Sequence, residues 1–395
     1  MELLPKSETN SRQLEIQSRM RESGLDALFV LQNADLYYFS GTVQVGLLCI
    51  PAEGEPVFLV QKSLSRARQE SPLERLIAIR GLRKAPEALE AEGIRHLRRV
   101  GLEMDVLPAA QYLRLREIFS ATEFVDVSEE IRRLRMIKSA YEVAQIRRAA
   151  GMLGLAFREI PGWMRPGATE LEISANLEGL LRRLGHQGMV RMRGFNYEIS
   201  YGTVSVGSNA CHPTYFPGPV GFTGLYPAVP NGGSYSRLER GHTLMADVVG
   251  GFGGYIADKT RTFSLGEPPG DMEAAHTLIL EILRELEAML KPGVPCEKLW
   301  EHSLDRVKHS PYADGYMGLG DSRVRFLGHG VGLELDELPV LAKDSSIALQ
   351  PGMTLAVEPK IFFPGRGGIG VENTYLITET VCENLTPFPE EIIRA

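Results

Sequence analysis

Four carboxylates lie in pairs around two turn sequences, and their spacing suggests a chemically active site. Asp247 and Asp258 flank the glycine-rich stretch GGFGG, with residues typical of β-strands on both sides. The midpoint between the two aspartates falls within this turn, so a symmetric hairpin would place their carboxylates directly opposite each other. Opposed residues have Cβ atoms about 5 Å apart, and two ionised carboxylates at that distance repel unless a proton or a cation separates them.

A second pair of carboxylates repeats this arrangement near the C-terminus. Residues 353–363 and 368–378 read as two further strands around a Pro-Gly-Arg turn. Glu358 and Glu372 lie one on each strand, and their midpoint is Gly365. One such pair is compatible with carboxylates that face water on a half-exposed sheet, but two pairs favour a site.

A histidine between the hairpins could complete a metal-binding set. His329 stands among glycines, which let the backbone approach a partner closely: Gly328, Gly330 and Gly332. A lone histidine is usually structural or solvated, but the neighbouring acidic hairpins favour a ligand here. Four carboxylates would require about two divalent cations for neutrality, and oxygen-rich sites suit hard or borderline metals.

These residues resemble the metal set of the pita-bread metallopeptidases, which include prolidase, aminopeptidase P and methionine aminopeptidase. The blocks GYIADKTRTF, GHGVGLE, VEP and GVENTYLIT carry the resemblance, which extends over roughly the whole chain. It implies two divalent metal ions, with manganese expected first and cobalt, iron or zinc also tolerated. By the family's pattern Asp247 would bind one ion, and His329 and Glu358 the other. Asp258 and Glu372 would bridge both.

Two further residues are candidates for a catalytic role on the same resemblance. His212 lies in a segment rich in glycine, proline and aromatics, where the family has a histidine that reaches into the substrate site. The alternative is an exposed loop histidine, and the segment from His212 to Asp247 is longer than in a typical prolidase. Asp336 begins the block DELP, where the peptidases usually carry a second histidine.

Asp336 is one of several departures that bear on the substrate. Val340 and Gly370 stand where many family members have arginine. A substrate with a free C-terminal carboxylate would therefore lose partners, whereas a cationic or zwitterionic small substrate would gain one in Asp336.

The resemblance implies a dinuclear hydrolase that cleaves Xaa-Pro peptide bonds. Glu358 would take up the proton of the attacking water, and His212 would stabilise the oxyanion or the leaving group. The alternatives are a relative that hydrolyses a small non-peptide amide, as ectoine hydrolase or creatinase does, and a lyase that acts on dimethylsulfoniopropionate. A non-enzymatic binding module on the same fold belongs to a different class, and such proteins tend to have lost metal ligands.

The elements that must position these residues divide into two expected domains of an α/β (α+β) fold. Residues 1–135 resemble the creatinase and prolidase N-terminal domain, which helps form the family's dimer, so a homodimer is expected. Within it we predict a helix over 12–24, a strand over 25–31, and a hairpin of 46–50 with 57–61.

Residues 136–395 are expected to form the catalytic domain. Ser139 and Glu142 have the spacing of a capping box at the start of a helix. The sequence 164–185 is weakly echoed by 290–309, and each precedes one carboxylate hairpin. We therefore expect a pita-bread domain of two related α/β halves, with the metals where they join.

The composition and the apolar pattern of the chain bear on its expected partners and location. The chain has 395 residues, a net charge of −7 and four scattered cysteines, which argues against a disulfide framework and gives no hint of nucleic acid. It contains no apolar run long enough for a membrane span and no signal-peptide pattern at its start. The expected partners are therefore a small peptide or amide substrate, with no nucleic acid and no membrane, and the expected location is the cytoplasm.

Overall fold

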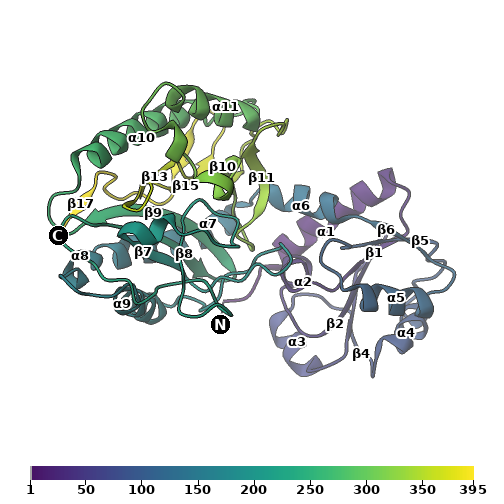
Figure 1. Cartoon of the computed structure of the whole chain (residues 1–395). Helices are drawn as coiled ribbons and strands as arrows, with labels where there is room; N and C mark the ends of the chain where they lie inside the picture. The colour runs from purple at the N-terminus through teal and green to yellow at the C-terminus, as the bar shows by residue number, and fades with distance from the viewer. Residues whose placement is uncertain (1) are drawn as a thin grey trace. The chain divides into compact units, whose positions relative to one another are not determined.

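The computed structural model describes residues 2–395, which form two compact units (Figure 1). The first unit ends at Arg135 and the second is Met136–Ala395. None of the helices formed by residues 2–395 combines the length and apolar character needed to cross a membrane.

The first unit is built on one six-stranded sheet with the strand order β4-β3-β2-β1-β5-β6. Strands β2 and β3 pair antiparallel, which confirms the predicted hairpin. Helix α1 begins at Lys6 rather than Arg12, because Pro5 supplies an extended backbone directly before it. The elements are α1 (Lys6–Glu22), β1 (Ala27–Val30), α2 (Asn33–Ser40), β2 (Gly46–Pro51), β3 (Val57–Val60), α3 (Leu64–Glu70), β4 (Leu76–Ala78), α4 (Ala85–Ala91), β5 (Arg99–Leu102), α5 (Ala109–Ile118), β6 (Glu123–Asp126) and α6 (Ser128–Met136).

The second unit begins with a four-stranded sheet, ordered β17-β9-β8-β7, against which helix α7 packs. Ser139 caps α7 and forms the predicted capping box with Glu142. Thr169 and Glu172 form a second capping box at the start of α9. The elements are α7 (Ala140–Phe157), α8 (Ile160–Trp163), α9 (Glu170–Arg183), β7 (Gly202–Val206), β8 (Thr243–Phe252), β9 (Tyr255–Ser264) and, from the C-terminus, β17 (Ile393–Arg394).

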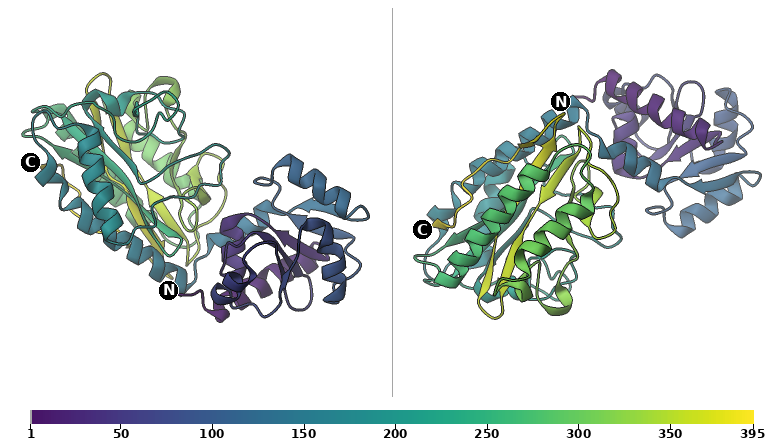
Figure 2. Two further views of the ribbon diagram at one scale, coloured as in Figure 1. Left: turned by 90° about the horizontal axis from the view of Figure 1, so that it is seen from below. Right: turned by 90° about the horizontal axis from the view of Figure 1, so that it is seen from above.

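The other half of the second unit carries a five-stranded sheet, ordered β11-β10-β12-β15-β16, and the short pair β13-β14. Its helices pack on these strands, so the sheets of the unit lie between α7 and α9 on one side and α10 and α11 on the other (Figure 2). The elements are α10 (Gly270–Met289), α11 (Cys296–Val307), β10 (Phe326–Gly330), β11 (Glu337–Ala342), β12 (Thr354–Val357), β13 (Lys360–Phe363), β14 (Gly367–Gly370), β15 (Asn373–Ile377) and β16 (Cys382–Asn384).

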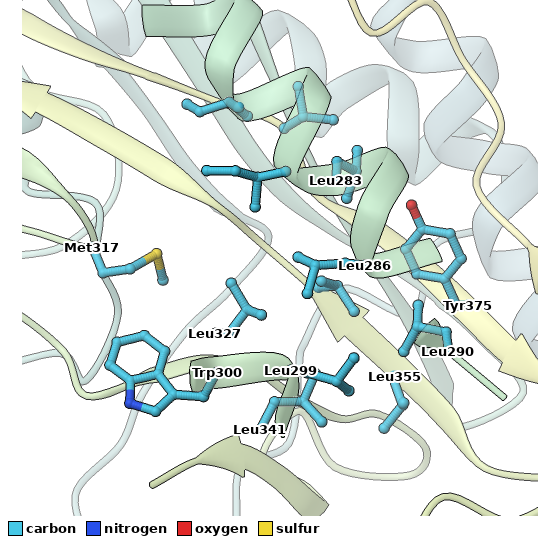
Figure 3. Packing of buried hydrophobic residues seen from close by; sticks show 14 of the residues in the cluster. Leu283, Leu286, Leu290, Leu299, Trp300, Met317, Leu327, Leu341, Leu355 and Tyr375 are labelled. Atoms are coloured by element: carbon cyan, nitrogen blue, oxygen red, sulfur yellow. The ribbon is translucent and has the colours of Figure 1, made fainter. Parts of the chain in front are cut away.

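A large apolar cluster fixes α10 and α11 on this second sheet. Burial of such side chains stabilises the fold by about 25 cal/mol for each Å² removed from water. The close-up in Figure 3 shows leucines of both helices pointing toward residues of the strands. The labelled members are Leu283, Leu286, Leu290, Leu299, Trp300, Met317, Leu327, Leu341, Leu355 and Tyr375.

The register of the first carboxylate hairpin differs from the symmetric one expected. Val249 pairs with Asp258, and Asp247 pairs with Thr260, so the two aspartates are diagonal neighbours rather than directly opposed. The turn residues are Gly253 and Gly254, both with positive φ (60° and 92°). A two-residue turn with two left-handed positions suits glycine, and it moves the centre of the hairpin one residue beyond the predicted midpoint.

The register of the second hairpin is the predicted one. β12 pairs with β15 and β13 pairs with β14, and both ladders are centred on Gly365. Glu358 and Glu372 fall between the two ladders at opposed positions. The predicted strands are each interrupted there, because Pro359 has no N–H to donate to a ladder.

Candidate metal centre

The structure brings the five predicted metal ligands to one place, where the two carboxylate hairpins meet. Ligand atoms of Asp258, His329 and Glu372 lie within 4.8 Å of one another, and so do those of Asp247, Glu358 and Glu372. The two groups share Glu372. His329 Nε2 is 3.9 Å from Glu358 Oε1, which links the groups a second time.

Local contacts hold the two hairpins together at this point. The N–H of Glu372 donates to the carbonyl of Thr260 (3.1 Å), and the hydroxyl of Thr260 donates to Glu372 Oε2 (2.6 Å). Thr374 forms a matching pair of hydrogen bonds with the backbone of Asp258, each 2.9 Å long. These bonds fix the backbone at Asp258 and Glu372 and hold one carboxylate oxygen of Glu372.

His329 reaches the site because its strand lies unusually close to β12. A Cβ atom on Gly328 would lie 2.0 Å from the carbonyl oxygen of Ala356, a distance that no side chain tolerates. The glycines that bracket His329 thus permit the close approach that was predicted from the sequence.

Lys360 is a member of the site that sequence reasoning missed. Its Nζ donates to Glu358 Oε2 (2.5 Å), Glu372 Oε2 (3.0 Å) and Asp247 Oδ2 (3.1 Å). The side chain is 0% exposed. A signal was available, because residues two apart in an extended chain point to the same side, which directs Lys360 toward Glu358.

Burial and mutual repulsion shift the acidities in this cluster. Burial raises the pKa of Asp247, raises that of Glu358 to about 8, and, together with the charge of Glu372, raises that of Asp258 well above its usual range. Burial also acts on Glu372, but the charges of Lys360 and His329 outweigh it and lower the pKa of this carboxyl. For Lys360 the surrounding carboxylates outweigh burial and raise its pKa.

The donor set fits a divalent metal ion. Glu372 Oε1 is buried without a hydrogen-bond partner among the described residues, and Glu372 belongs to both ligand groups. A buried acceptor left unpaired costs about 1–3 kcal/mol, which a cation would offset. Carboxylate oxygens with one imidazole suit manganese, iron, cobalt or zinc.

A cavity of about 240 Å³ is lined by the five predicted ligands. Most of its wall is apolar, and Asp336 adds a further charged group. Val340, one of the departures from the family pattern, also lines it. The apolar side chains are Met192, Ile199, Phe216, Pro217, Pro219, Val220, Phe222, Val249, Phe326, Leu335 and Val340.

Asp336 has a structural partner that the sequence did not reveal. Its Oδ1 accepts from the backbone N–H of Arg193 (2.7 Å) and its Oδ2 from that of Gly194 (2.9 Å). Asp336 thus fastens the segment around Arg193 beside the cavity. Its effect on substrate choice stays a prediction.

The structure does not bring His212 to the metal ligands. His212 is exposed and borders a smaller hollow, which shares Phe216, Gly218, Pro219 and Val220 with the wall of the cavity. This position gives its predicted catalytic role no support, so the role stays a prediction.

The segment 206–234 carries several residues of the cavity wall, and a buried glutamate anchors it. Glu170, at the start of α9, accepts from the N–H of Val206 (2.6 Å), the amide of Asn209 (2.9 Å) and both the N–H and hydroxyl of Ser234 (3.0 and 2.5 Å). Burial raises the pKa of this carboxyl, while these donors oppose the shift.

We therefore expect Glu170→Ala to destabilise the second unit by about 3 kcal/mol, because it leaves several buried donors unpaired. Unfolding by urea, followed by tryptophan fluorescence, measures this directly, since both tryptophans of the chain lie in that unit. The exposed Glu301→Ala is the matched control. A loss below about 1 kcal/mol for Glu170→Ala would show that the anchor is unimportant.

This fold and this set of residues define a class of protein. Residues 144–379 match metallopeptidase family M24, and residues 12–137 match the creatinase/prolidase N-terminal domain. The chain belongs to metallopeptidase family M24 and is a peptidase-like enzyme with the pita-bread fold.

Relatives support this assignment along nearly the full chain. An Xaa-Pro dipeptidase of Pyrococcus horikoshii is 27% identical over 378 residues, which cover 95% of this chain and 96% of the relative. A probable dipeptidase of Mycobacterium tuberculosis is 26% identical over 385 residues, 94% of this chain and 92% of the relative. Among solved structures, an Xaa-Pro dipeptidase from Bacillus anthracis has a TM-score of 0.83 and 25% identity, and the match covers 98% of this chain and all of that one.

Proposed function

We propose that this enzyme is a metal-dependent hydrolase that cleaves the bond between an amino acid and proline. The observation that carries the proposal is that all five predicted ligands meet and line one mostly apolar cavity. Relatives named as Xaa-Pro dipeptidases support the substrate class. Manganese is the expected metal. The family pattern would give two ions, but the ammonium of Lys360 lies within one of the two ligand groups.

The residues of the chain have separate tasks in this reaction. Asp258, His329 and Glu372 would hold a divalent ion, which would supply the Lewis acidity for activating water and polarising an amide carbonyl. Glu358 lines the cavity and is the acid–base group that takes up a proton and delivers it to the leaving nitrogen. The apolar wall receives the proline ring and excludes bulk water.

One assay separates this proposal from the small-amide alternative. The protein, stripped of metal and reloaded with Mn²⁺, is tested side by side on Xaa-Pro dipeptides, longer Xaa-Pro peptides and ectoine. We expect kcat/KM to be highest for an Xaa-Pro substrate. Cleavage of ectoine alone would show that the substrates are small non-peptide amides. Binding of these compounds without any turnover would favour a binding module.

We expect Asp336 to affect the choice between Xaa-Pro peptides and small non-peptide amides. A carboxylate in the cavity attracts a cationic group and disfavours a substrate carboxylate. We expect Asp336→His to raise kcat/KM for Xaa-Pro dipeptides relative to ectoine by about tenfold, which corresponds to 1.4 kcal/mol. An unchanged ratio in a folded variant would show that Asp336 acts only through Arg193 and Gly194.

The wider setting is also proposed rather than observed. We propose a homodimer, because the first unit resembles a domain that helps form the family's dimer, and a cytoplasmic location. Light scattering on the purified chain measures the first, and fractionation of the source cells measures the second.

A further inference from the structure

We propose that the ammonium group of Lys360 takes the place of one of the two metal ions, so that the centre binds a single divalent ion. This inference rests on the proposed metal dependence but not on the substrate. It assigns to Lys360 a positioning role within the site.

The first step of the argument is geometric. The three carboxylates that accept from Lys360 Nζ are Asp247, Glu358 and Glu372, and these same residues form one of the two candidate metal groups. The nitrogen lies 2.5–3.1 Å from an oxygen of each, inside the group. A metal ion bound by carboxylates would need the same space, since its oxygen ligands lie at about 2.0–2.2 Å.

The second step is that the other group remains available. Lys360 donates to Oε2 of Glu372, whereas Oε1 of the same carboxylate is buried and unpaired among the described residues. Within residues 2–395, no ammonium group is ion-paired with Asp258. The contact of an ammonium with this group is that of Lys360 with Glu372 Oε2. Lys360 therefore supplies one positive charge to the site, and the group of Asp258, His329 and Glu372 is left for a metal ion.

The third step is that the fold is adapted to this lysine. Lys360 and Gly370 face each other across the β13–β14 ladder. A Cβ atom on Gly370 would lie 2.4 Å from Cγ of Lys360 and 3.0 Å from its Cβ. The aliphatic part of Lys360 thus occupies the space that a side chain at position 370 would need. The position of Lys360 therefore depends on a glycine opposite it.

The ammonium and a metal ion are not equivalent. An ammonium pairs with the carboxylates and fixes them, but it has no coordination site for water or for a substrate oxygen. Lys360 does not line the cavity, so it acts through Asp247, Glu358 and Glu372 rather than on the substrate. A single ion would then carry all the Lewis acidity of the site.

Metal counting on the full-length protein tests the inference without any substrate. Wild type, Lys360→Ala and the exposed control Lys298→Ala are stripped of metal, reloaded with excess Mn²⁺ and freed of unbound ion. Manganese per chain is measured by mass spectrometry, and electron paramagnetic resonance distinguishes an isolated Mn²⁺ from a coupled pair about 3.5–4 Å apart. We expect one isolated ion in wild type and Lys298→Ala, and a coupled pair in Lys360→Ala.

The other outcomes overturn the inference in different ways. A coupled pair in wild type would mean that Lys360 moves aside for the second metal, while metal dependence itself would stand. No bound manganese in wild type would overturn the metal dependence of the proposed function as well. One ion in a folded Lys360→Ala would show that another feature excludes the second.

A crystal structure of the manganese-loaded wild type covers the case in which Lys360→Ala does not fold. We expect one anomalous peak among Asp258, His329 and Glu372, with Lys360 Nζ in its present place. Two peaks would overturn the inference.

Discussion

Replacing Asp258 with alanine is expected to remove bound metal and to lower kcat/KM by on the order of a thousandfold or more. Asp258 contributes a ligand atom to the group with His329 and Glu372, and no other carboxylate of the first hairpin takes part in that group. The fold should persist, because the loss of one buried carboxylate relieves repulsion from Glu372.

Metal analysis and kinetics on an Xaa-Pro substrate are measured on the same preparation. Asp305→Ala, which removes an exposed carboxylate from α11, is the control and should retain both metal and activity. Wild-type metal content in Asp258→Ala would contradict the ligand assignment, whatever its effect on turnover.

Replacing Arg261 with methionine is expected to destabilise the second unit by about 3–5 kcal/mol. This guanidinium is fully buried on β9, and four of its five hydrogen bonds reach the second hairpin and the C-terminal segment, while the fifth stays on β9. Removing it leaves buried acceptors unpaired where the hairpins join. The acceptors are the carbonyls of Thr260, Glu372, Phe388 and Pro389 and the side chain of Asn373.

The measurement is the urea midpoint by tryptophan fluorescence, with the exposed Arg165→Met as control. Because Glu372 accepts through its backbone, the variant should also bind metal more weakly. A destabilisation of less than about 1 kcal/mol would mean that water replaces the lost donors, and that Arg261 does not join the hairpins.

Much of the candidate site could be predicted from the sequence, because its ligands lie on hairpins whose geometry is local. The opposed positions of Glu358 and Glu372 follow from the turn at Gly365 and from the two-residue period of strands. The same reasoning failed by one residue at the first hairpin. There, GGFGG contains several glycines that tolerate a left-handed backbone, and the sequence alone does not say which two form the turn.

Contacts between distant segments were decided by the tertiary structure alone. The backbone N–H groups that hold Asp336 belong to residues more than a hundred positions away, and the exposed place of His212 depends on a long irregular segment. Lys360 lies two residues from Glu358 in the sequence. Its position among carboxylates of both hairpins depends on Asp247, whose Oδ2 the first hairpin places 3.1 Å from Nζ. The sequence by itself therefore determined which residues gather at the centre, because turn chemistry and strand period act locally. Only the packing of the two halves decided that a lysine lies among them, because that arrangement requires carboxylates from both hairpins.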